Sequence, residues 1–183
     1  MILLDFLKSN EKDITEVFQA CKYFKKQNWL IDYKCKSLQD EGYLKVNEFR
    51  ELLSENDFIG AISKLTGINE AVLIKTKITD VFYFFSFLLE ELEVIIKTEN
   101  YINSLQSDYP SDEEGLYEQA GVERLNKFSY YNVIDELAFN DITKHKEIGE
   151  KTYKEILTKL LRDKDLKIIR ENYNGLKKPI NNA

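Results

Sequence analysis

The stretch LTGINEAVLIKTKITDVFYFFSFLLEELEVII, residues 65–96, decides the fold of this chain. In its second half, apolar side chains recur every three or four residues, which is the period of an α-helix. Charged residues return at Glu90, so the run is too short for a membrane span, which needs ~20 apolar residues. We predict a central core helix over residues 80–97, with Thr79 as its N-cap. The apolar residues of its main face, and those beside that face, are Val81, Phe85, Leu88, Leu92 and Ile95, then Phe82, Leu89 and Ile96.

Composition extends this prediction to the whole chain. The 183 residues are 43% apolar and 13% aromatic, which is enough for a buried core, and they include only seven Gly and two Pro. Few turn-forming residues beside many Lys, Glu, Asp and Asn favour helices over a turn-rich β-sandwich. We therefore predict a mainly α, helical bundle-like fold.

One segment divides the chain. Residues 106–116, QSDYPSDEEGL, hold a Pro, a Gly and four acids and are predicted to form an acidic loop. We expect a helical domain over 1–105 before it, a C-terminal helical subdomain over 117–173 after it, and a polar arm over 174–183.

The first fifty residues give weaker patterns. A helix over 13–27 is predicted by the helical spacing of Ile14, Val17, Phe18, Cys21 and Phe24. A strand is then indicated by the alternation of Trp29, Ile31, Tyr33 and Cys35 with the residues between them. Residues 43–46, after Gly42, are its candidate partner, which predicts a short β-hairpin within 29–46. A helix over 29–39 remains the alternative.

Residues that favour helix ends divide the next segment into short helices. Asn47 is predicted to cap one helix, and Ser54, with Asp57 three residues later, to begin the next. Gly67 is predicted to end that second helix, and Asn69 to cap a third.

Two longer helices and a short one are predicted after the acidic loop. The first covers 117–139, and Asn140 or Asp141 stops it and caps a short helix that ends at Gly149. The last covers about 151–173 and is predicted to bury Tyr153, Ile156, Leu157, Leu160, Leu161, Ile168 and Ile169.

No catalytic or binding motif is recognisable. His145 is the only histidine and lies between two lysines, so we expect an exposed, non-catalytic side chain. Cys21 and Cys35 lack a CxxC spacing and are expected to be reduced and buried. The start MILLDFLKSNEK lacks the basic region and cleavage site of a secretory signal. We predict no catalytic residue, no metal site and no cofactor, and rank an enzyme below a binding or structural protein.

The net charge of −6 is unevenly distributed. Residues 144–183 carry +5 and the others −11, with −9 concentrated in residues 80–124. This polarity suits docking against other copies or a charged partner, whereas the acidic balance does not favour nucleic acid. We predict that the C-terminal helix and arm contact the acidic region of a neighbouring chain. Charges that only solvate the chain's own helices are the alternative. The candidate interaction residues are Glu90, Glu91, Glu93, Asp112, Glu113, Glu114, Lys164, Lys167, Arg170, Lys177 and Lys178.

Two segments carry a resemblance. They are AISKLTGINEAVLIKTKITDVFYFFSFLLEEL, residues 61–92, and FSYYNVIDELAFNDITKHKEIGEKTYKEILTKLL, residues 128–161. The first is similar, in its order of a short helix, LTG, a second short helix and an apolar helix, to small helical morphogenesis proteins of tailed phages. The second resembles the aromatic-rich helix, Leu-Ala step and long helix with paired Leu of the same family.

The resemblance implies a tail assembly chaperone-like protein, or a ring or connector component of the tail or head–tail junction, with no active site. We expect a homo-oligomer that contacts other phage structural proteins, in the virion or in the host cytoplasm during assembly, and not in a membrane. The alternative is an acidic regulatory binding module that engages a host protein, whose acids over 80–124 would lie in rows on one face.

Overall fold

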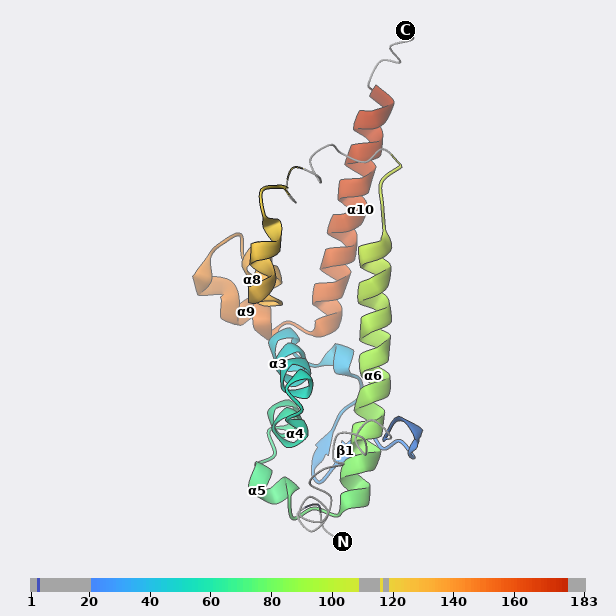
Figure 1. The fold of residues 1–183 in the computed structure, drawn as a ribbon, viewed down its shortest axis with the longest axis vertical. Helices are drawn as coiled ribbons and strands as arrows, with labels where there is room; N and C mark the ends of the chain where they lie inside the picture. Colours follow the sequence, from blue (N-terminus) through green and yellow to red (C-terminus); the bar gives the residue numbers. More distant parts are fainter. Residues whose placement is uncertain (1–2, 4–20, 109–115, 117–118, 178–183) are drawn as a thin grey trace. The chain divides into compact units, whose positions relative to one another are not determined.

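The protein is described by a computed structural model over Leu3, residues 21–108, Leu116 and residues 119–177 (Figure 1). This part of the chain is mostly helical with one small antiparallel hairpin, which confirms the predicted fold class. With η for a 3-10 helix, its elements are η1 (Cys21–Tyr23), β1 (Trp29–Leu30), β2 (Tyr33–Lys34), η2 (Leu38–Asp40), α3 (Tyr43–Ser54), α4 (Phe58–Thr66), α5 (Glu70–Leu73), α6 (Ile78–Ser104), η3 (Val122–Phe128), α8 (Tyr131–Leu137), η4 (Ile142–Lys144), α9 (His145–Glu150) and α10 (Tyr153–Lys177).

The chain divides into two compact units. The first unit is Met1–Ile96 with Gly149–Tyr153, and the second is Lys97–Ile148 with Lys154–Ala183. The predicted boundary in the acidic loop stays a prediction, because residues 109–115 lie outside the described part.

Helix α6 supplies much of the core of the first unit. Its apolar period is largely confirmed, since Val81, Phe85, Leu88 and Ile95 of the predicted face are buried. Leu92 of that face is half-buried, and Ile96, predicted beside it, is 39% exposed. The helix is longer at both ends than predicted, and Thr79 is not its N-cap. The N–H groups of Asp80 and Val81 both donate to the Lys77 carbonyl (3.0 and 3.3 Å), so Lys77 holds the N-cap position. The fully or almost fully buried residues of this helix in the first unit are Val81, Phe84, Phe85, Ser86, Leu88 and Ile95.

The predicted hairpin is present, although its second strand lies earlier than predicted. Strands β1 and β2 pair antiparallel, with Trp29 opposite Lys34 and Leu30 opposite Tyr33. Ile31 occupies the turn with φ 55°, in the left-handed region. The turn ends the predicted alternation, so Leu30 is buried and Trp29 is exposed.

Residues 43–46, predicted as the partner strand, instead begin α3. Tyr43, Val46 and Phe49 are buried at three-residue intervals, which is a helical period. Asn47 is therefore inside the helix, where its buried Nδ2 donates to the Tyr43 carbonyl at 2.9 Å, and its predicted role as a cap is wrong.

The other predicted helix ends are largely confirmed. The Asp57 carboxylate accepts a 2.9 Å backbone hydrogen bond from the first turn of α4. Gly67 ends α4 with φ 72°, and Asn69 caps α5. Ser54 is the last residue of α3, so the second helix begins after Asp57 and not at Ser54.

A short later segment belongs to the first unit. Two backbone hydrogen bonds, 2.7 and 2.8 Å long, join residues 41–43 to residues 151–153. The Tyr153 ring is buried with its centroid 4.9 Å from that of Tyr43. The Tyr153 hydroxyl accepts a 2.7 Å hydrogen bond from Arg50 Nη1. The segment is thus held by its backbone and by one aromatic anchor.

The predicted helix over 13–27 is only partly described, since residues 13–20 lie outside the described part. Cys21–Tyr23 form η1, and residues 24–27 are not helical. Tertiary hydrogen bonds to α6 replace the helical ones. The Gln27 N–H donates to the Tyr83 carbonyl (3.1 Å), and Ser86 Oγ donates to the Phe24 carbonyl (3.1 Å).

In the second unit, the helix predicted over 117–139 is broken within its described part. The 3-10 helix η3 and the helix α8 are separated at Ser129, which has φ 47°. Ile134 and Ala138 of this segment are buried, whereas Tyr131 is 49% exposed. The prediction for Asp141 is confirmed, since its carboxylate accepts a hydrogen bond from the Thr143 N–H (3.1 Å) and caps η4.

Helix α10 continues through Lys177, so residues 174–177, predicted as part of the arm, are helical. It buries Tyr153, Ile156 and Leu157 as predicted, but Ile169 is 62% exposed, and that prediction is wrong. The other three residues predicted to be buried, Leu160, Leu161 and Ile168, are half-buried.

Candidate functional site

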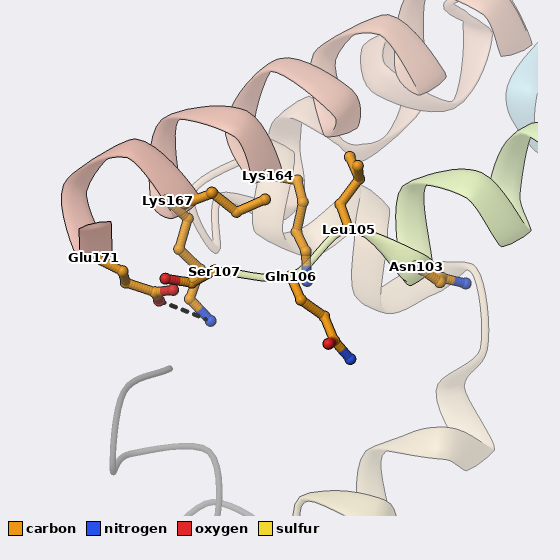
Figure 2. A pocket seen from close by; sticks show the side chains of 8 residues that line it. Asn103, Leu105, Gln106, Ser107, Lys164, Lys167 and Glu171 are labelled. Carbon is orange, nitrogen blue, oxygen red and sulfur yellow. Dashed lines mark ion pairs between the residues drawn. The ribbon is translucent and has the colours of Figure 1, made fainter. Parts of the chain in front are cut away.

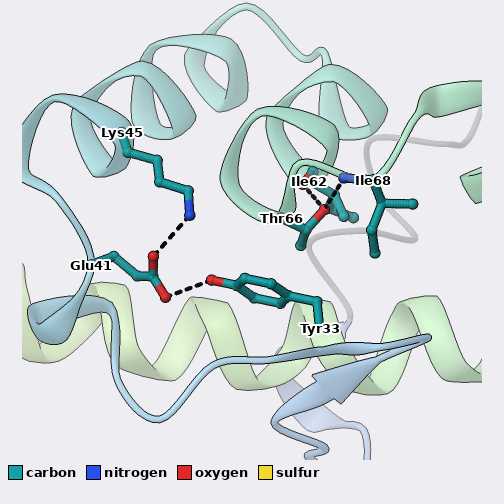
Figure 3. A network of polar contacts seen from close by, with 6 residues as sticks. All are labelled: Tyr33, Glu41, Lys45, Ile62, Thr66 and Ile68. Carbon is teal, nitrogen blue, oxygen red and sulfur yellow. Dashed lines mark hydrogen bonds and ion pairs between the residues drawn. The ribbon is translucent and has the colours of Figure 1, made fainter.

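A polar network joins the hairpin to the start of α3 in the first unit (Figure 3). The Tyr33 hydroxyl donates to Glu41 Oε1 at 2.6 Å, and Lys45 Nζ lies 2.9 Å from Glu41 Oε2. Burial, and then the hydrogen bond to Glu41, raise the pKa of Tyr33 well above its usual range. Tyr33 therefore keeps its proton and serves as a hydrogen-bond donor that fixes the hairpin.

The acidic residues of α6 that were predicted to take part in interactions have different partners within the chain. Glu90 pairs with Lys26 at 2.5 Å, with both side chains about half exposed. Glu91 accepts hydrogen bonds from Ser37 Oγ and from the Leu38 N–H, the latter at 3.0 Å. Glu91 thus anchors the start of η2 inside its own unit.

Glu93 is exposed and, with Glu90, lines a shallow cavity of about 270 Å³. Lys26 lines the same cavity, so a cation lies beside these acids. The predicted acids Asp112, Glu113 and Glu114 lie outside the described residues. The described acids of α6 do not form a uniform acidic row, because Glu91 faces its own unit.

The predicted basic residues lie along α10. Lys164 and Lys167 line a cavity of about 320 Å³ with Asn103 and residues 105–107, all within the second unit (Figure 2). Lys167 is 3.6 Å from Glu171 one helical turn on, as the dashed line in Figure 2 marks. Arg170 is exposed and forms no ion pair with a described residue. Lys177 Nζ lies over the Tyr173 ring at 4.3 Å, and Lys178 lies outside the described part.

The same face of α10 is fastened to the chain that follows α6. Ser107 Oγ donates to Asn172 Oδ1 at 2.5 Å, and the Asp108 N–H donates to the same oxygen at 3.0 Å. Ile168 is half-buried on this side. One face of α10 is therefore already occupied by its own unit.

His145 is less isolated than predicted. Its side chain is 27% exposed, and Nε2 lies 2.9 Å from Asp135 Oδ1. Nearby, hydrogen bonds from the side chain and backbone of Thr143, followed by Lys144, lower the pKa of Asp141. These contacts fasten α8, η4 and α9 to one another.

The two cysteines form no disulfide and are fully buried, as predicted. Burial is the main cause that raises the pKa of each thiol to about 12. Both therefore remain protonated thiols at neutral pH, which makes them poor nucleophiles.

A second face of α10 carries an apolar surface that was not predicted from the sequence. Four large apolar side chains stay exposed there: Leu166 (37%), Ile169 (62%), Tyr173 (56%) and Leu176 (73%). Their spacing of three, four and three residues places them in one row, which we call the α10 stripe. The spacing was readable from the sequence, but Ile169 was predicted to be buried, and Leu176 was placed in the polar arm that was predicted to follow the helix.

A smaller apolar cluster projects from the turn after α8. Phe139 is 82% exposed and Ile142 is 77% exposed. Phe139 and Asn140 have φ values of 56° and 60°, in the left-handed region that non-glycine residues rarely adopt.

Comparisons with protein-family models, curated proteins and solved structures find no match. In the described part of the chain, no helix is long and apolar enough to cross a membrane. The same residues contain no group of three His, Cys, Asp or Glu side chains arranged to hold a metal ion.

Proposed function

We propose that this chain is a non-enzymatic protein of tailed-phage assembly that acts through protein–protein contacts, either in a tail or head–tail ring or as a tail assembly chaperone. The observation that carries the contact role is the α10 stripe, whose four side chains are 37–73% exposed in one row. Apolar surface in water costs roughly 25 cal/mol per Å² relative to burial, so a partner that covers the stripe gains that free energy. Contiguous exposed apolar surface typically marks an interaction site.

The phage assignment is supported by the resemblance of residues 61–92 and 128–161. The order of elements that this resemblance implies is present in α4, the Gly67 helix end, α5 and α6 for the first segment. The second segment carries α8, α9 and the first part of α10.

The alternative, an acidic module that engages a host protein, has less support. That function requires acidic side chains of residues 80–124 that lie in rows on one face and are available to a partner. Glu91 instead accepts hydrogen bonds from Ser37 and Leu38, and Glu90 is paired with Lys26.

The test follows the protein during phage assembly. Virions and assembly intermediates are purified from an infection in which the chain is tagged, and its copy number per particle is measured by quantitative mass spectrometry. We expect a fixed copy number in virions for a ring component, or in intermediates alone for a chaperone. Absence from both, with recovery of the chain on a host protein, would refute the proposal in favour of the acidic module.

A matched pair of variants tests the role of the stripe. Ile169→Ser removes a stripe residue, whereas Ile142→Ser makes the same change at a similarly exposed isoleucine outside it. We expect Ile169→Ser to lower incorporation into particles and Ile142→Ser to leave it unchanged. Equal effects of the two substitutions would show that the α10 stripe is not the contact surface.

A further inference from the structure

We propose that the α10 stripe binds the α10 stripe of a second copy of this chain, in a parallel, in-register two-helix seam. This inference rests on the proposed function, because it names the partner of the same surface. It differs from the contact between opposite charges predicted above, because both copies use the same helix.

The spacing of the stripe is the first argument. Leu166, Ile169, Tyr173 and Leu176 follow one another at intervals of three, four and three residues. Two apolar positions per seven residues is the pattern by which two helices pack along a common seam. In that repeat Leu166 and Tyr173 occupy the first core position, and Ile169 and Leu176 the second.

The state of the helix is the second argument. The stripe spans less than half of α10, which runs over 25 residues. A free peptide of this seam's length would have to become ordered on binding. Here the helix is already formed, and Asn172, at the edge of the stripe, fastens it to Ser107 and Asp108. Pre-formed elements bind without that ordering cost, so a short seam suffices for a concentration-dependent association.

Charge complementarity selects the second copy and its direction. Asp165 directly precedes the first stripe residue, and Arg170 directly follows the second. In a parallel seam, the residue at such a flanking position of one helix lies close to the residue five positions later in the sequence of the other helix. Asp165 of each copy therefore faces Arg170 of the other, which gives two opposite-charge pairs. Both side chains are exposed, and neither forms an ion pair with a described residue.

The antiparallel arrangement is less favourable. Pairing Leu166 with Leu176 and Ile169 with Tyr173 of the other copy places the two Arg170 side chains next to each other near the centre. Like charges at that place repel one another. The ion pair between Lys167 and Glu171 lies outside the seam in either arrangement and does not decide between them.

The first experiment measures self-association of the full chain by sedimentation velocity over a concentration series. We expect the wild-type chain and Ile142→Ser to associate reversibly with similar dissociation constants. Ile169→Ser should raise the dissociation constant at least tenfold. The far-UV circular dichroism of the three proteins should agree, because the changed residues are exposed and Ile and Ser have similar helix propensities. A wild-type chain that stays monomeric, or equal behaviour of the two variants, would overturn the inference.

The second experiment tests pairing and direction together. Asp165→Arg and Arg170→Asp each place like charges opposite one another, so each variant alone should associate more weakly than the wild type. An equimolar mixture of the two restores both opposite-charge pairs and should associate as the wild type does, as should the double variant Asp165→Arg/Arg170→Asp. A mixture that associates no better than its components would overturn the parallel seam.

The outcomes separate this inference from the proposed function. A chain that stays monomeric in both experiments, yet is incorporated into phage particles, overturns the self-contact and leaves the phage role standing. A self-associating chain that is absent from particles and intermediates supports the seam and refutes the phage role.

Discussion

Replacing Glu91 by alanine tests whether this acid anchors its own unit or faces a partner. The substitution removes the acceptor of hydrogen bonds from Ser37 Oγ and from the N–H of the fully buried Leu38. A hydrogen bond to a charged group contributes about 1.5–3 kcal/mol, and the loss leaves the Leu38 N–H without its acceptor. Because Glu91 keeps some solvent contact, we expect the free energy of unfolding to fall by about 2–3 kcal/mol.

The neighbouring acid is the matched control. Glu90 pairs with Lys26, and the two side chains are 51% and 44% exposed, so Glu90→Ala should cost less than about 1 kcal/mol. Glu91→Gln keeps an acceptor oxygen but loses the charge, and its effect should fall between the other two.

Urea unfolding followed by tryptophan fluorescence measures these differences. The single tryptophan, Trp29, lies in the same unit as Glu91, so it reports on the unit that the substitution affects. If Glu91→Ala destabilises the protein no more than Glu90→Ala, the anchor role is refuted and Glu91 returns to the candidate interaction residues.

Three further predictions concern the first unit. Gly67→Ala should lower the free energy of unfolding by about 1 kcal/mol in urea titrations, because φ is 72° there and no neighbouring atom would contact the added Cβ. A smaller effect than that would contradict the left-handed helix end. Tyr153→Phe should cost about 1–2 kcal/mol in the same assay, since it removes the acceptor of the Arg50 hydrogen bond; an unchanged midpoint would contradict that contact. Burial raises the pKa of Cys21 and Cys35 from 9.0 to about 12, so the folded state holds these protons more tightly than the unfolded state. Their contribution to stability should be complete below pH 9 and decline as pH rises from 9 toward 12, and a thiol reagent should label them only on unfolding. Rapid labelling of the folded protein at neutral pH would contradict their burial.

Local signals predicted much of the fold. The apolar period of α6, the Asn69 cap and the Gly67 helix end depend on a few neighbouring residues, and the structure confirms them. Each of these features has a direct physical cause in the local sequence, such as an acceptor for free N–H groups or a residue that tolerates positive φ.

The predictions that were wrong failed because of contacts between residues that are distant in the sequence. Asn47 is a good capping residue by type, but the burial of Tyr43 and Val46 begins α3 earlier and places Asn47 inside it. Residues 24–27 lose their predicted helix because Gln27 and Phe24 bond to α6. Local patterns do not contain these partners.

The candidate site was predicted only in part. The sequence identifies the charged residues of α6 and α10 but not their use, since Glu91 and Glu90 have similar sequence surroundings and different partners. The α10 stripe was missed because Ile169 was predicted to be buried and Leu176 was assigned to the polar arm, whereas both are exposed.

Disulfide cross-linking of Tyr173→Cys is the most direct test of the central claim, that this chain works through a contact of α10 with another chain. Position 173 is a core position of the proposed seam, so in a parallel pair the two introduced thiols face each other. Cys21 and Cys35 are fully buried with raised pKa and should not compete.

Mild oxidation of the folded variant should convert it to a species of twice the 21.6 kDa chain mass on a non-reducing gel. Ile142→Cys, exposed but outside the stripe, should remain at the monomer mass under the same conditions. Cross-linking of Tyr173→Cys at no higher rate than Ile142→Cys would contradict the account.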